Sequence, residues 1–134
     1  MSGVRLRNGF LVGIACAVLL LSSGCRKPVE KLAAVAIEYE IGPQPVRVGS
    51  VVLFVKLRDA AGAPVPGARV SLEADMSHPG MAAVIGEARE VAPGTYQGSL
   101  DFAMAGDWVV LIHVTLPDGQ TLEREVSVSG VTAN

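Results

Sequence analysis

The residues from Met76 to Met81 (MSHPGM) gather the side chains of this sequence that are best suited to hold a metal ion. The segment contains two of the four methionines and one of the two histidines of the chain. Thioether sulfur and imidazole nitrogen are soft donors that suit Cu(I) and offer little to Mg²⁺ or Ca²⁺. The segment therefore predicts a Cu(I) site with Met76, His78 and Met81 as ligands.

Two local features bring these donors together. A strand that begins at Arg69 and continues to His78 would place Met76 and His78 on one face, because side chains alternate along a strand. Pro79 and Gly80 suit the central positions of a type II turn, in which Pro sets φ and Gly accepts a positive φ. Such a turn keeps its first and last Cα atoms, here those of His78 and Met81, within about 7 Å.

Two residues further along the chain are additional candidates. Met104 lies just before the turn that leads to Trp108, and we expect it to complete a set of three methionines and one histidine. His113 ranks lower, because it falls on the opposite strand face from Trp108, which is expected to be a core residue. The alternative stays open that the methionines fill irregular core edges and that His78 is an exposed loop residue.

The elements that must position these residues are expected to be β-strands. Short apolar or alternating runs, separated by Gly, Pro and Asp turns, follow one another at fairly regular spacing, which is typical of a β-sandwich. We expect inner rows at Val51–Leu57 and Val70–Ala74, and a hairpin turn at Pro117-Asp118-Gly119. The predicted fold is an all-β, immunoglobulin-like sandwich of about seven strands over residues 33–134. The seven runs cover residues 33–41, 46–58, 69–75, 83–91, 95–102, 108–116 and 121–129.

The N-terminal residues have the pattern of a secretory signal peptide rather than of a spanning helix. Arg5 and Arg7 precede an apolar run from Phe10 to Leu21, and small residues follow it. A membrane-spanning helix needs about 20 apolar residues, so this run is too short, and its order of regions is that of a cleaved leader.

The end of this leader, Leu21-Ser-Ser-Gly-Cys25, resembles the lipobox of bacterial lipoprotein precursors. The resemblance implies a signal peptide over residues 1–24, lipid on Cys25, a tether over residues 25–32, and a domain held at the bacterial cell envelope. That domain would face the periplasm or the cell exterior, with its lipid chains in the membrane. Position 26 is Arg rather than Asp, so the retention signal that enteric bacteria use for the inner membrane is missing.

The positions of the cysteines and the net charge limit the classes of function that the domain can have. Cys16 would leave with the signal peptide and Cys25 would carry lipid, so the mature domain would have no thiol in an oxidising compartment. Loss of two arginines changes the formal net charge from −2 to −4, which argues against a nucleic-acid partner. The sequence contains no nucleophile elbow, phosphate-binding glycine loop or zinc-protease motif, so we expect no enzyme.

Three segments of the chain resemble the YtkA-like domain, which is related to FixH-like proteins. They are MSHPGM at 76–81, GTYQG at 94–98 and FAMAGDW at 102–108, and the resemblance covers about residues 46–128. It implies an immunoglobulin-like envelope domain in which Met76, Met81 and Met104 belong to a Met-rich site, with a copper-handling or oxidase-assembly protein as partner. Two functions follow as hypotheses: a module that binds or delivers Cu(I), and a metal-free sandwich that docks on another envelope protein.

Overall fold

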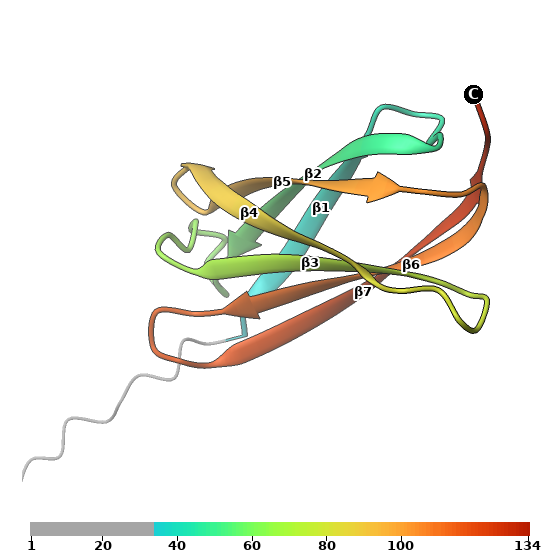
Figure 1. Cartoon of the computed structure of the whole chain (residues 1–134). Coiled ribbons are helices and arrows are strands. Elements are labelled where there is room, and N and C mark those ends of the chain that lie inside the picture. The colour runs from blue at the N-terminus through green and yellow to red at the C-terminus, as the bar shows by residue number, and fades with distance from the viewer. Residues whose placement is uncertain (1–33) are drawn as a thin grey trace, which may run out of the picture.

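The computed structural model describes residues 34–134, and every regular element in this part of the chain is a β-strand (Figure 1). The prediction of an all-β domain of about seven strands is therefore confirmed. The predicted signal peptide (residues 1–24), Cys16, the lipidation at Cys25 and the tether (residues 25–32) lie outside the described residues. The strands are β1 (Ala36–Gly42), β2 (Gly49–Arg58), β3 (Arg69–Met76), β4 (Val84–Ala92), β5 (Thr95–Phe102), β6 (Gly106–Thr115) and β7 (Thr121–Val131).

The strand order is that of an immunoglobulin-like domain. All neighbours are antiparallel, and the order across the sheet is β1-β2-β5-β4-β3-β6-β7. Lettered A to G along the chain, this order is A-B-E-D followed by C-F-G, the two sheets of a constant-type immunoglobulin domain. The structure differs from two separate sheets, because β3 and β4 also pair from Val70–Ala88 to Ala74–Val84. One continuous sheet therefore folds over on itself to form both layers.

The core lies between the two layers and is filled by alternate side chains of the strands. The predicted inner rows of β2 and β3 are buried, as are Tyr96, Leu100 and Phe102 on β5. Trp108 is only 2% exposed, and its ring centroid lies 4.9 Å from that of Phe102 with the planes tilted by 42°. Tilted aromatic pairs of this kind are favourable, so Trp108 is the core residue that the sequence predicts.

The two edges of the folded sheet approach each other. The backbone N–H of Val48, between β1 and β2, donates to the carbonyl of Thr132 at 2.9 Å, and the N–H of Thr132 donates to the carbonyl of Val46 at 3.3 Å. Further along the same seam, the guanidinium carbon of Arg124 on β7 lies 5.9 Å from the ring centroid of Tyr39 on β1. These contacts bring β1 and β7 together, so the sheet is nearly closed.

The connections fall at two opposite ends of the sandwich. The β3–β4 and β5–β6 connections lie at one end, on the right in Figure 1, and the chain enters β1 at the other end, beside the β6–β7 hairpin. Trp108 near the start of β6 pairs with Met76, the last residue of β3. The strands therefore carry the predicted metal-binding residues to the end of the domain that lies away from the N-terminal connection.

Candidate soft-donor site

The strand that leads into the MSHPGM segment ends one residue after the predicted run of residues 69–75 and does not reach His78. β3 ends at Met76, and the next residue, Ser77, still contacts the start of β6. The backbone N–H and the hydroxyl of Ser77 both donate to the carbonyl of Asp107, at 3.2 and 2.8 Å. The prediction that β3 continues to His78 is therefore wrong, and Met76 and His78 do not share a strand face.

The turn that follows has the predicted form. Pro79 and Gly80 are turn residues, and φ of Gly80 is 95°, a value that glycine adopts readily. His78 and Met81 stand at the two ends of this turn. Both are exposed, Met81 with 43% of its surface, so their side chains are accessible to an ion or to a partner protein.

Met76 is held more firmly than the loop residues. Its side chain is half-buried and packs against the hydrophobic core. Its terminal methyl carbon, Cε, lies 3.1 Å from the position that a Cβ atom would take at Gly106. Met76 therefore lies against the start of β6, with its thioether at the boundary between core and solvent.

Met104 is fixed at the same place through its backbone. The indole Nε1–H of the buried Trp108 donates to the carbonyl of Met104 at 3.0 Å, while the side chain of Met104 is 48% exposed. The core residue Trp108 therefore anchors the connection that carries Met104. Met76 and Met104 are thus both tied to residues 106–108.

Met76 is the last residue of β3, His78 and Met81 lie on the β3–β4 connection, and Met104 lies on the β5–β6 connection. Both connections are at the same end of the sandwich (Figure 1). Within residues 34–134, no group of three or more His, Cys, Asp and Glu side chains is arranged to hold a metal ion. The three methionines at this end offer thioether sulfur, a donor that suits soft ions such as Cu(I).

His113, the weaker candidate, is not brought to this end. It pairs with Ser71, five residues before Met76 on β3. Its Nε2 lies 3.1 Å from a carboxylate oxygen of Glu73, and its Nδ1 lies 3.0 Å from one of Glu123. Both ring nitrogens are therefore occupied by neighbours on the outer face of β3, β6 and β7.

Three residues that shape the site carry no metal-binding signal in the sequence. Ser77 and Asp107 are 30 positions apart, and nothing in their local sequence predicts their contact. Gly106 has φ of 133° and accommodates Met76. Its place between Ala105 and Asp107 suggests a turn, but the neighbour that it accommodates comes from another strand.

Two solved structures are distantly similar to the chain. Among solved structures, the soluble domain of PmoD from Methylocystis sp. strain Rockwell is similar with a TM-score of 0.48 and 13% identity, covering 77% of this chain and 98% of that one. Murine CRIg is similar with a TM-score of 0.42 and 10% identity, covering 76% of this chain and 99% of that one. Both likenesses are too distant to indicate a function.

Residues 34–134 contain no apolar helix of membrane-spanning length.

The remaining comparisons use the sequence alone. No curated protein sequence matches the chain. The model of the YtkA-like family matches residues 31–113, more than half of the chain. The chain therefore belongs to the YtkA-like family.

Proposed function

We propose that this protein is a lipid-anchored envelope domain that binds Cu(I) through Met76, His78, Met81 and Met104 and delivers it to another envelope protein. The observation that carries this proposal is the placement of all four soft donors at one end of a domain whose described residues contain no cysteine. The proposed activity is binding and transfer rather than catalysis.

The donor set suits the compartment. YtkA-like domains are extracytoplasmic envelope domains, where thiolates are prone to oxidation. Thioether and imidazole ligands keep their affinity for Cu(I) and form no disulfides. A methionine and histidine site is therefore a suitable choice for a copper-binding domain outside the cytoplasm.

The differences in exposure support transfer as well as binding. Met76 is half-buried and packed on β6, while His78, Met81 and Met104 are exposed. A partner with its own soft donors can replace the exposed ligands one at a time while Met76 still holds the ion. The partner that fits this arrangement is a copper-handling or oxidase-assembly protein of the envelope.

The proposed anchor fits the same arrangement. Lipid on Cys25 would hold the chain at the membrane through buried CH₂ groups. The chain enters β1 at the end of the sandwich opposite the soft donors (Figure 1). The donors would therefore face away from the N-terminal attachment, toward proteins in the aqueous space.

A titration with Cu(I) against a competing chelator tests the proposal. We expect one ion bound per domain, and we expect Met76→Ala and Met81→Ala each to weaken binding. His113→Ala is the matched control, since His113 is engaged by Glu73 and Glu123 away from the site. Binding that is as tight in both methionine variants as in the unchanged protein would remove the donor cluster from the account.

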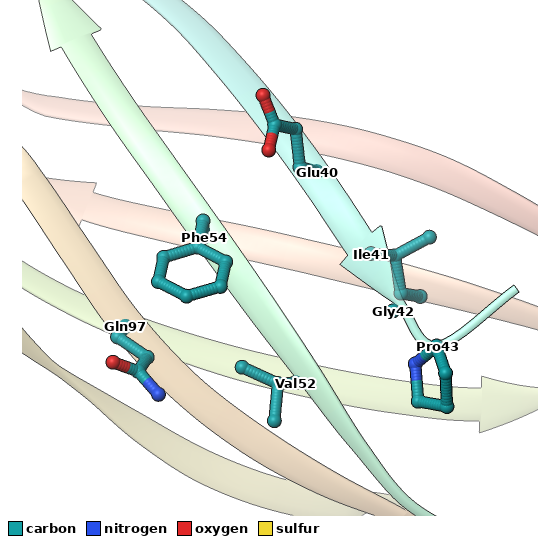
Figure 2. A pocket seen from close by; sticks show the side chains of 7 residues that line it. All are labelled: Glu40, Ile41, Gly42, Pro43, Val52, Phe54 and Gln97. Carbon is teal, nitrogen blue, oxygen red and sulfur yellow. The ribbon is translucent and has the colours of Figure 1, made fainter.

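A second candidate function is metal-free docking on another envelope protein. It is favoured by a shallow groove of about 390 Å³ on the outer face of β1, β2 and β5. Figure 2 shows Val52 and Phe54 between Gln97 on one side and Ile41 and Pro43 on the other. The groove lies on a sheet face, apart from the soft-donor connections, so Phe54→Ser should abolish partner capture and leave Cu(I) affinity unchanged if docking is the function.

A further inference from the structure

Gly106, the first residue of β6, lies beside the end of the Met76 side chain. A Cβ atom built at Gly106 would meet Met76 Cε at 3.1 Å, and no other heavy atom beyond its chain neighbours lies within 4 Å. Contacts of this length are closer than normal van der Waals separation, so one partner must move. Because the thioether end of methionine is flexible, Met76 would yield rather than the backbone.

The start of β6 also fixes the backbone at Met104 and beside Met76. Asp107 receives both hydrogen bonds of Ser77, the residue after Met76, and Trp108 holds the carbonyl of Met104. The backbone of both methionines is therefore registered against residues 106–108. These hydrogen bonds do not fix the Met76 side chain, which packs against the hydrophobic core and has its Cε beside Gly106.

We propose that Gly106 is a positioning residue for the soft-donor site, because its lack of a side chain lets the Met76 thioether lie across the start of β6. This inference rests on the proposed function, since it concerns how one ligand of the Cu(I) site is held. A side chain at position 106 would displace Met76 from the place where the fold presents it to a bound ion.

The chain contains a matched control for this substitution. Gly49 at the start of β2 has φ of 117°, close to the 133° of Gly106, and nothing lies within 4 Å of its Cβ position. Alanine at either position introduces comparable backbone strain, because L-residues rarely adopt such φ values. Only Gly106→Ala also displaces Met76.

The experiment compares Cu(I) affinity in the full protein, purified in detergent, by competition with a chelator. We expect Gly106→Ala to bind Cu(I) about 10-fold more weakly, a typical effect of losing a supporting residue around a metal site. We expect Gly49→Ala to bind as the unchanged protein does, even if both variants lose similar thermal stability. Equal affinities in the two glycine variants would overturn the positioning role.

A third variant, Met76→Leu, separates this inference from the proposed function. If Met76→Leu weakens binding and Gly106→Ala does not, Met76 is a ligand and only the positioning role fails. If Met76→Leu binds Cu(I) normally, Met76 is not a ligand, so the positioning role fails, while binding of Cu(I) by the remaining donors stands.

If Gly106→Ala does not fold, NMR of the unchanged protein decides instead, since Cu(I) is diamagnetic. The account predicts a nuclear Overhauser effect between the Met76 methyl protons and the Gly106 α-protons, both without metal and with Cu(I). Its absence from the metal-free protein would overturn the inference.

Discussion

At the level of single residues, the soft donors differ in how firmly the fold holds them, and this difference predicts different stability effects. Met76 packs against the core edge, whereas Met81 stands in a turn. Met76→Ala should lower the free energy of unfolding by about 1–2 kcal/mol, less than the 2–5 kcal/mol of a fully buried methionine. Met81→Ala should change it by no more than about 0.5 kcal/mol. Urea unfolding of both variants measures the difference, and equal losses would contradict the described placement of Met76.

Glu90 gives the fold a dependence on pH. The nearby Tyr96 hydroxyl lowers the pKa of Glu90 below its usual 4.5. The backbone N–H groups of Gly94 and Gly67, which donate to the carboxylate, lower this pKa further, and desolvation opposes them. Because the folded pKa is the lower one, the charged carboxylate stabilises the fold above pH 4.5, and this contribution is lost as the pH falls through the folded value.

The corresponding experiment compares melting temperatures at neutral and acidic pH. Glu90→Gln should melt below the unchanged protein at pH 7, and the gap should narrow as the pH falls below about 4.5. Glu87→Gln, an exposed change on the same strand, serves as the control and should show no such trend. A gap between Glu90→Gln and the unchanged protein that stays constant with pH would contradict the role assigned to this carboxylate.

At the level of the elements, the close approach of strands depends on glycines within them. A Cβ atom at Gly98 on β5 would lie 2.8 Å from Leu72 Cδ1 and 2.9 Å from the carbonyl oxygen of Glu87. Gly98→Ala should therefore destabilise the domain by about 1–3 kcal/mol through overpacking. Ser99→Ala, on the exposed face of the same strand, should stay within about 0.5 kcal/mol. Chemical denaturation tests both, and a neutral Gly98→Ala would show that β3, β4 and β5 are less tightly packed than described.

Elements whose signals are local could be predicted from the sequence. The inner rows of β2 and β3 follow from the alternation of side chains, and the turn at Pro79-Gly80 follows from the φ preferences of those residues. The contact of Ser77 with Asp107 could not be predicted, because it joins residues 30 positions apart. The pairing of β3 with β4, which joins the two layers, likewise has no signal in the sequence of either strand.

Some features of the candidate site could likewise be predicted from the sequence, and others could not. The common end of Met76, His78, Met81 and Met104 could be predicted from the turns, while their role as Cu(I) ligands stays a prediction. The support from Gly106 and the Trp108 hydrogen bond to Met104 could not, since each joins residues through the tertiary fold. Sequence patterns therefore indicate the donors, and the structure adds how they are held.

At the level of the whole molecule, the chain enters a nearly closed sandwich at one end, and the soft donors lie at the other. The central proposal is that these donors bind one Cu(I) ion. X-ray absorption at the copper edge of the Cu(I)-loaded protein tests this claim most directly, because it distinguishes sulfur from nitrogen and oxygen neighbours. The account predicts at least two thioether sulfurs and one imidazole nitrogen, with the nitrogen lost in His78→Ala and kept in His113→Ala. A spectrum of nitrogen and oxygen neighbours alone, or one that His78→Ala leaves unchanged, would contradict it.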